Sequence, residues 1–482
     1  MLWAAAVPLT AAPAFSVPGF VDETLYQGNG MITMRFDPAG RLWVIEKQGR
    51  VLMFEPNPGG PTVLNYDYYE TGQLSALPNF STLTPVKSGV VNSFTLDPRQ
   101  RDDDFAFRYS GTIAITTAGS YTFYLSSDDG SRLFINDALV VNYDGLHGAG
   151  EQSGVINLPT GNHTIRVEYF ERGGGQSLTV QYAGPGVSKG PVAQGVFKAP
   201  VVFADYSSQV NTQGERGMMG LALDPDFANT RYVYLLFATG SDQRLVRLTA
   251  NATFTAAVAG SETILLSGLP NGNTVHKAGD IAFHPNDPNN LYIMLGDDGE
   301  RYFVSNLDNY YGKLLKVSAA DGKGLPTNPF FNGDLNSARS RIWSYAYRNP
   351  YRFTFDPAAP VADVLYVSEN GDGTDRLSRI AKGADGAWPT SDYLVSSADG
   401  KRKVLQTSDP SKTGVAIVRS GPLAPGGNPV IYNTRYGGGD RNEVRRWTLT
   451  GAGFDTLTFR RGERSVVVPM ATTPNAVAGR SL

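Results

Sequence analysis

Residues 36–45 read Phe-Asp-Pro-Ala-Gly-Arg-Leu-Trp-Val-Ile. The Asp-Pro pair is typical of a turn, and the aromatic and β-branched run that follows it is typical of a strand. Related units, each with an Asp-Pro or His-Pro pair before a strand-like run, begin at Leu223, Phe283 and Phe355. A short unit of strands and turns that recurs along a chain indicates the blades of a β-propeller.

The spacing of these units predicts an inserted domain. Their prolines stand at positions 38, 225, 285 and 357, so the gaps are 187, 60 and 72 residues. Residues 64–190 account for the excess in the first gap, which leaves 19–63 and 191–482 for the propeller. We expect six blades, with the fifth unit at Asn428-Pro429 and the sixth near Thr473-Pro474. The last blade is expected to be incomplete where the sequence stops at Leu482.

The composition fits an all-β fold. The 482 residues include 54 glycines and 30 prolines, which favour turns and disfavour helices, and 11% are aromatic. The formal net charge of −3 gives no reason to expect a nucleic-acid partner. The absence of cysteine excludes disulfides, thiolate metal sites and a cysteine nucleophile. No run after the N-terminus approaches the ~20 apolar residues of a membrane span.

The N-terminal residues 1–18 are mostly apolar or small. They are similar to the second half of a secretory signal peptide, although the usual basic residues before the apolar run are missing. The alternative is a buried or unstructured tail. We expect a signal-peptide remnant and therefore a secreted or periplasmic protein.

The inserted residues 64–190 predict a β-sandwich. Alternating strand-like segments at 105–109, 121–125, 164–170 and 178–182 are separated by turn residues. Between two of these segments, Asp128 and Asp129 place two carboxylates side by side. A bound hard cation such as calcium would relieve their repulsion. The alternative for an Asp-Asp-Gly run is a solvated turn.

The same residues resemble the PA-14 domain, which is a β-sandwich. The resemblance is carried by Tyr68-Tyr69-Glu70, residues 105–111, Ser127-Asp128-Asp129-Gly130, Gly145-Leu146-His147-Gly148 and Tyr169-Phe170-Glu171. It implies that Asp128 and Asp129 hold calcium and, through it, vicinal sugar hydroxyls. The family's third ligand is an asparagine from a later loop, for which Asn136 and Asn142 are nearby candidates.

His276 is the histidine most suggestive of chemistry. It stands just before a repeat strand, where the chain is expected to enter near the propeller axis and where loops converge. An imidazole titrates near neutral pH and suits a general base. A single histidine is, however, more often an ordinary hydrogen-bonded polar residue.

The propeller segments resemble the soluble quinoprotein glucose/sorbosone dehydrogenases, which are six-bladed propellers. The matching stretches are 214–227, 276–280, 295–299, 310–317, 342–350, 368–371 and 388–389. The resemblance implies an aldose dehydrogenase that uses pyrroloquinoline quinone and calcium, with His276 as base and Asp297 orienting it. It further implies that Arg348 and Asn349 contact the quinone. The backbone of Gly371 and Asp372 would hold the calcium.

Three departures from that family keep a second hypothesis open. Glu215 stands where several members have glutamine, and its charge would repel the carboxylates of the quinone unless Arg216 or calcium neutralised it. Arg435 is the candidate for a late basic residue, and residues 466–470 lack the family's Arg-x-Arg-Asp. The alternative to a sugar dehydrogenase with a carbohydrate-binding module is a non-catalytic extracellular propeller whose PA-14 domain binds carbohydrate.

Overall fold

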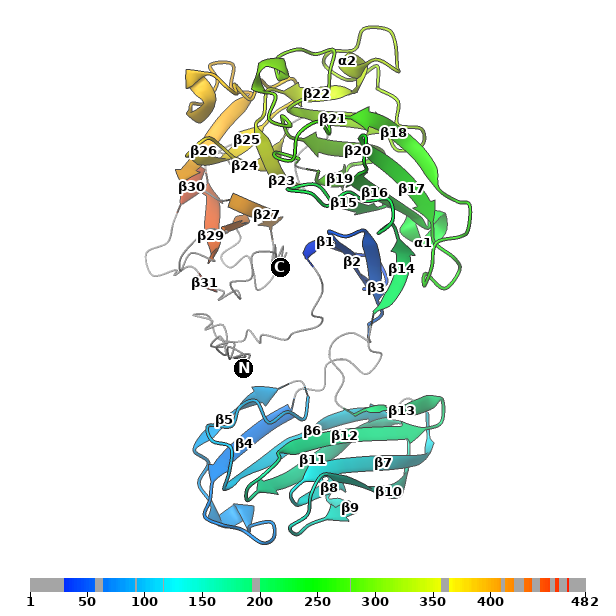
Figure 1. Cartoon of the computed structure of the whole chain (residues 1–482), viewed down its shortest axis with the longest axis vertical. Helices are drawn as coiled ribbons and strands as arrows, with labels where there is room; N and C mark the ends of the chain where they lie inside the picture. Colours follow the sequence, from blue (N-terminus) through cyan, green and yellow to red (C-terminus); the bar gives the residue numbers. More distant parts are fainter. Residues whose placement is uncertain are drawn as a thin grey trace, which may run out of the picture. The chain divides into compact units, whose positions relative to one another are not determined.

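A computed structural model confirms an all-β chain in which a sandwich interrupts a propeller. It describes residues 30–56, 64–91, 93–115, 117–192, 200–277, 279–356, 364–408, 412–419, 429–435, 443–450, 456–458 and 466–467. These residues form two compact units, one with the described residues from 30–54 and 200–467 and the other with those from 55–192 (Figure 1).

The propeller unit contains five antiparallel sheets among its described residues. The first two are β1 (Met31–Phe36), β2 (Leu42–Glu46), β3 (Arg50–Phe54) and β14 (Val201–Asp205), then β15 (Met218–Leu223), β16 (Tyr232–Ala238), β17 (Gln243–Thr249) and β18 (Thr263–Leu269). The third and fourth are β19 (Ile281–His284), β20 (Asp287–Leu295), β21 (Lys313–Ser318) and β22 (Ile342–Tyr345), then β23 (Asn349–Phe355), β24 (Leu365–Asn370), β25 (Asp375–Ile380) and β26 (Arg402–Ser408). The fifth is β27 (Lys412–Val418), β28 (Val430–Arg435), β29 (Glu443–Thr450) and β30 (Thr456–Thr458), with β31 (Val466–Val467) also pairing with β29. The sixth unit expected near Thr473-Pro474 lies outside the described residues.

The first strand of each blade lies innermost. Contacts join β1 to β15, β15 to β19 and β23 to β27, so these blades meet along their first strands, whereas the third and fourth blades meet through β20 and β23 (Figure 1). Because strands alternate in direction, the connection into each first strand opens on the same face as the loop between the second and third strands. We call this the entry face of the propeller.

The Asp-Pro turns lie on the opposite face, between the first and second strands. In the first blade Asp37 organises this turn, since its carboxylate accepts the backbone N–H groups of Ala39 and Arg41 at 2.9 and 3.1 Å. The same carboxylate accepts the indole N–H of Trp43 at 3.0 Å. The repeat that predicted the fold therefore marks a side-chain-capped turn.

The first blade is completed only after the insertion. Its outer strand β14 pairs with β3, although about 150 residues separate them. Trp43 of β2 packs edge-on against Phe203 of β14, with ring centroids 4.8 Å apart. The sandwich is thus inserted between the third and fourth strands of one blade, and the blade core still closes.

The second unit is a two-sheet sandwich. One sheet has the order β5-β4-β6-β11-β8-β9 and the other β10-β7-β12-β13. The strands are β4 (Leu64–Glu70), β5 (Lys87–Val91), β6 (Phe105–Ile115), β7 (Gly119–Asp128), β8 (Ser131–Ile135), β9 (Ala138–Tyr143), β10 (Gly150–Leu158), β11 (Gly161–Glu171), β12 (Ser177–Gly184) and β13 (Val187–Pro191). Alternate residues of β7 are buried, as expected for a strand with one face on a core. That core includes Tyr68, Phe107, Phe123 and Tyr169.

The described helices are single short turns, α1 (Phe227–Thr230) and α2 (Ala338–Arg341), together with three 3₁₀ segments. Among the described residues no helix has the length and apolar character needed to cross a bilayer.

Candidate functional site

Three of the residues singled out in the sequence occupy equivalent places in successive blades. Glu215 precedes β15, His276 precedes β19, and Arg348 precedes β23. Each therefore lies on the entry face, where the chain comes in towards an innermost strand. The backbone joins two of these connections, because Glu215 donates its N–H to the Thr274 carbonyl at 2.8 Å.

His276 and Asp297 form a hydrogen-bonded pair. The imidazole Nδ1 lies 2.7 Å from Oδ1 of Asp297, which comes from the loop between β20 and β21. The Asp297 side chain is 1% exposed and that of His276 is 17% exposed, so the carboxylate is buried behind a partly open ring. The other carboxylate oxygen, Oδ2, accepts the indole N–H of Trp388 at 2.9 Å. Asp297 is thus fixed from both sides, and the pair leaves Nε2 of the imidazole facing away from it.

The backbone around this pair adopts uncommon conformations. His276 and Asp298 have φ angles of 53° and 55°, in the left-handed region that non-glycine residues seldom occupy. Gly296 permits the loops to meet, since a Cβ there would lie 2.0 Å from the His276 carbonyl oxygen. Strained positions of this kind gather at functional sites more often than elsewhere.

A second pair runs alongside the first. Lys277 forms an ion pair with Asp298, and both side chains are 1% exposed. Burial lowers the pKa of Lys277, while the adjacent Asp298 opposes that shift. Asp298 also accepts the N–H of Gly272 at 2.7 Å. The adjacent residues His276 and Lys277 thus pair with the adjacent residues Asp297 and Asp298 of another loop. These two pairs fix the loop that carries His276.

Arg348 and Asn349 lie at the start of β23. The N–H of Arg348 donates to Glu369 at 2.7 Å, and Glu369 is itself held by a fully buried ion pair with Arg376 at 2.6 Å. The guanidinium of Arg348 donates to the Asn370 carbonyl at 3.2 Å and lies 5.5 Å from the ring of Trp388. Trp388 therefore contacts both Asp297 and Arg348, the residue that the family resemblance implies for the quinone.

Glu215 is exposed and accepts two weak hydrogen bonds. Its Oε2 is 3.3 Å from the Lys277 backbone nitrogen and 3.4 Å from Nδ2 of Asn349. Arg216 points elsewhere: its guanidinium donates to Asn271 at 3.0 and 2.7 Å. Among the described residues, Arg216 has no recorded contact with the Glu215 carboxylate, so the expected neutralisation by Arg216 is not what the geometry shows.

The remaining propeller residues are less informative. Gly371 follows β24 next to Asn370, and its N–H donates to Asp375 at 3.1 Å, which closes a turn. Asp372 is exposed in that turn. No described contact assigns their carbonyl groups to a ligand, so the calcium role remains a prediction. Arg435 ends β28, and its side chain lies outside the described part of the chain.

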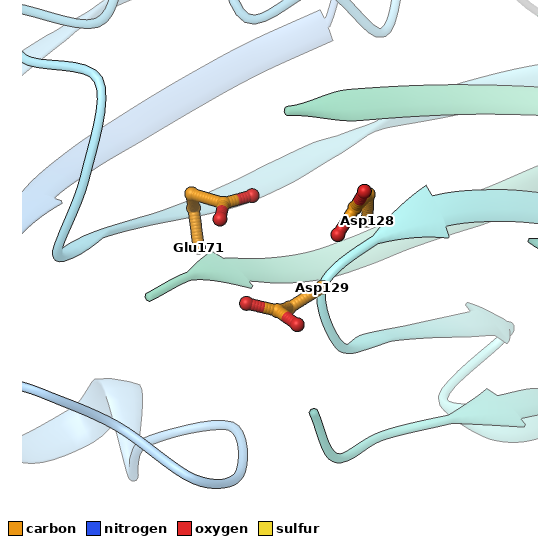
Figure 2. Close-up of side chains that lie close together, drawn as sticks. All are labelled: Asp128, Asp129 and Glu171. Atoms are coloured by element: carbon orange, nitrogen blue, oxygen red, sulfur yellow. The ribbon is translucent and has the colours of Figure 1, made fainter. Parts of the chain in front are cut away.

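In the sandwich, three carboxylates gather where β7 and β11 end. Asp128 is the last residue of β7, Asp129 follows it in the turn to β8, and Glu171 is the last residue of β11. One oxygen from each lies within 4.8 Å of the others (Figure 2). The first two were expected from the sequence, but Glu171 was quoted there only as part of a motif. The clue to Glu171 is its position in the fold, because it ends β11, the strand that pairs with β8.

Backbone and hydroxyl donors surround this cluster. Asp129 accepts the N–H groups of His147 and Arg172 at 3.0 and 3.1 Å. Glu171 accepts the Tyr169 hydroxyl at 2.7 Å and the Gly173 N–H at 2.8 Å. Burial raises the pKa of Glu171 to about 7, and the charges of the two aspartates add to the shift. Among described residues no arginine or lysine side chain forms an ion pair with any of the three carboxylates.

The two candidate asparagines are occupied by other partners. Asn136 bonds His163 at 2.8 Å and accepts the Thr164 N–H at 3.0 Å. Asn142 accepts from Arg132 at 3.2 Å. Neither contact involves the carboxylate cluster, so the third acidic oxygen in the structure comes from Glu171.

Comparison with known families assigns both units. A glucose/sorbosone dehydrogenase family model matches residues 191–438, and a PA14 domain model matches residues 59–194. The chain belongs to the glucose/sorbosone dehydrogenase family. It carries a PA14 domain within the propeller sequence.

Individual relatives are distant. An uncharacterized protein of Synechocystis is 26% identical over 260 residues, which cover 52% of this chain and 60% of that protein. The aldose sugar dehydrogenase YliI of Escherichia coli is 28% identical over 189 residues, which cover 38% of this chain and 48% of that enzyme. The solved PQQ-bound form of the aldose sugar dehydrogenase from Streptomyces coelicolor is 24% identical, with a TM-score of 0.43, over 57% of this chain and 72% of that one. The match thus spans about half to three-fifths of the curated relatives' own length.

Proposed function

We propose that this family member is a pyrroloquinoline-quinone-dependent aldose dehydrogenase whose PA14 domain holds carbohydrate through calcium. The observation that carries the proposal is the His276–Asp297 pair at 2.7 Å, set on the same face as Arg348 and Asn349. A base with a buried orienting carboxylate, on the same face as a guanidinium, suits removal of a proton from a sugar hydroxyl and of a hydride from the carbon that bears it.

The described residues fit a quinone with polar edges. Among the described residues, the buried Oδ1 atoms of Asn349 and Asn370 have no hydrogen-bond partner, which is unusual for buried amide oxygens. Arg348 uses one guanidinium donor on Asn370, and a guanidinium has five. Glu215 remains the departure, although its carboxylate already accepts two N–H groups. Arg348 and Asn349 would hold the quinone, and Gly371 and Asp372 would hold an accompanying calcium ion.

When bound, the quinone supplies the acceptor for the hydride that leaves the anomeric carbon. His276 takes the proton of the anomeric hydroxyl at Nε2, since Nδ1 is engaged with Asp297. The buried carboxylate of Asp297 keeps the ring in this tautomer and stabilises the imidazolium. Trp388 keeps Asp297 in place through its indole N–H. The guanidinium of Arg348 would stabilise negative charge that builds on the quinone.

The carboxylate cluster of the sandwich suits a hard divalent cation. Calcium prefers six to eight oxygen ligands, and Asp128, Asp129 and Glu171 offer carboxylate oxygens close together. Burial, and to a lesser degree the charges of Asp128 and Asp129, raise the pKa of Glu171 to about 7, and a bound cation would oppose that shift. Sugar hydroxyls would complete the coordination of the ion. We further propose that residues 1–18, which are mostly apolar or small, belong to an export signal.

A reconstitution assay tests the proposal. The full chain is incubated with pyrroloquinoline quinone and calcium, and a panel of aldoses is offered with an artificial electron acceptor. We expect aldose-dependent reduction of the acceptor that requires the quinone. No turnover with any aldose despite bound quinone would favour the non-catalytic propeller. Glycan-array binding with and without chelator tests the sandwich separately, and calcium-independent binding would contradict its assignment.

A further inference from the structure

The propeller contains a cavity that the proposed reaction does not use. It has a volume of about 350 Å³ and lies where the inner strands β1, β19, β23 and β27 approach one another, with β28 adding to its wall. Its lining residues include Phe283, Pro285, Thr354 and Phe355 from the far ends of β19 and β23. Asn349 begins β23 on the entry face, and a strand rises ~3.3 Å per residue. Arg352 is three residues and Phe355 six residues past Asn349, so the cavity runs from about 10 to about 20 Å along β23 from the start of that strand.

Two arginines and one aspartate supply the charges of the lining. Arg35 donates to Asp280 at 3.0 Å, to the Thr33 hydroxyl at 3.0 Å and to the backbone of Met34 and Ile281. The carboxylate of Asp280 is 2% exposed and also accepts the Phe353 N–H at 3.3 Å. Asp280 is therefore fully engaged, and one positive charge in the lining remains uncompensated.

That charge belongs to Arg352. Its guanidinium donates to two backbone carbonyls, those of Tyr351 at 2.9 Å and Ile32 at 3.0 Å. Among the described residues it has no acidic partner. A guanidinium has five N–H donors in a planar fork, so the two recorded bonds leave donors for a carboxylate. The rest of the lining is largely apolar, with Ile32, Phe283 and Phe355 among its members.

We propose that this cavity binds a small organic monocarboxylate with an apolar body. Arg352 receives the carboxylate, while Asp280 already balances the charge of Arg35 in the same lining. The apolar body packs between the phenylalanines at the far ends of β19 and β23. A single negative charge balances the lining, whereas a second one would have no counterpart. The lining contains neither His276 nor Arg348, and the proposal does not depend on the proposed activity.

Ligand-observed NMR titration of the full chain tests the proposal, with benzoate as the probe. Benzoate at pH 7.5 has the required charge and body, benzamide has the same shape without the charge, and gluconate has the charge on a polar body. We expect benzoate to bind with a dissociation constant on the order of 0.1–1 mM, as for a ligand of about nine heavy atoms. Benzamide and gluconate should bind at least tenfold more weakly. If benzamide bound as tightly as benzoate, the requirement for a negative charge would be contradicted. If gluconate bound as tightly as benzoate, the requirement for an apolar body would be contradicted.

Variants locate the site. Arg352→Met should weaken benzoate binding at least tenfold, whereas Arg348→Met on the entry face should leave it unchanged. Arg352→Lys retains a positive charge near the Ile32 carbonyl but loses the planar set of guanidinium donors. We expect it to weaken benzoate binding about fivefold. This variant preserves the test if Arg352→Met does not fold, which circular dichroism will show. Loss of binding in Arg348→Met with full binding in both Arg352 variants would place the anion on the entry face and overturn the proposal.

Discussion

The polar cluster on the entry face and the carboxylate cluster of the sandwich differ in how their buried charges are balanced. On the entry face each buried carboxylate has a basic or donor partner: Asp297 has His276 and Trp388, and Asp298 has Lys277. At the end of the sandwich, Asp128, Asp129 and Glu171 lie together with backbone and hydroxyl donors but no described cationic side chain. The buried charges of the first cluster are matched by partners within the protein, whereas no described cationic side chain balances the carboxylates of the second.

This difference separates preorganisation from ligand dependence. A network whose charges are matched within the protein holds its geometry before substrate arrives, which favours catalysis. A cluster of like charges stores repulsion that a bound cation releases, so binding and stability are coupled. The entry face should thus respond to mutation mainly through activity, and the sandwich should respond to calcium mainly through stability.

Removal of the base should have the largest effect. We expect His276→Ala to lower kcat by about 10²–10⁴-fold in quinone-loaded enzyme, because general-base catalysis contributes that much. Its thermal unfolding should remain close to that of the wild type. His284→Asn in the same blade is the matched control, since it can retain the bond that His284 Nδ1 accepts from the Asn286 N–H and should keep kcat. A large loss of stability in His276→Ala with kcat retained would assign His276 a structural role.

Calcium should stabilise the sandwich. At 100 times its dissociation constant, a bound ion adds about 2.7 kcal/mol to the free energy of unfolding. We expect calorimetry of the full chain to show one transition moving upward with calcium and returning with chelator. Asp129→Asn should abolish this response, while Asp103→Asn in a different loop should preserve it. A calcium response that survives in Asp129→Asn would place the ion elsewhere.

Lys313 tests burial of a charge within the propeller. Burial lowers its pKa to about 7, and its ammonium nitrogen contacts the carbonyl of Val304 at 2.7 Å. Between pH 7 and the ordinary lysine value near 10.5, the unfolded chain binds more protons, so the free energy of unfolding rises with pH. We expect a gain of about 1–2 kcal/mol between pH 7 and 9, measured by denaturant unfolding.

Lys313→Met provides the control for this pH dependence. The variant should lose the rise in stability, because the titrating group is gone. The same slope in the variant and the wild type would show that other groups produce it.

Trp388→Phe should have the smallest effect. It removes the N–H that Asp297 accepts but keeps an aromatic ring beside Arg348, and we expect kcat/KM to fall about tenfold, the cost of one hydrogen bond to a charged group. Tyr393→Phe is the matched control, since the Tyr393 ring lies 5.4 Å from the Trp388 ring and its buried hydroxyl has no hydrogen-bond partner in the part of the chain that the structure describes. An unchanged pH profile and kcat in Trp388→Phe would show that Asp297 needs no support from the indole.

The sequence predicted the strands better than the contacts between them. The Asp-Pro turn at Asp37 and the alternation in β7 are local, so period and turn chemistry suffice to find them. The spacing also revealed the insertion. The return of β14 to β3 is a non-local pairing, and no local pattern encodes it.

The site was predicted in the same uneven way. His276, Asp297 and Arg348 were found through their motifs, and the structure brings the first two into contact. Trp388 was missed as a partner of Asp297 because 91 residues separate them. Glu171 was missed as a third carboxylate because its proximity to Asp129 depends on how β11 ends beside the β7–β8 turn. The hydrogen bond from Arg216 to Asn271 likewise depends on the tertiary fold, so the residue types alone do not predict it.

Direct titration of the full chain with pyrroloquinoline quinone tests the central claim. In the presence of calcium we expect saturable binding with a dissociation constant below about 10 μM, followed by the absorbance of the quinone. Arg348→Met should weaken it at least tenfold, as expected for loss of charged hydrogen bonds worth ~1.5–3 kcal/mol. Absence of binding at micromolar quinone, or equal binding by Arg348→Met, would contradict the assignment of the entry face as a quinone-dependent active site.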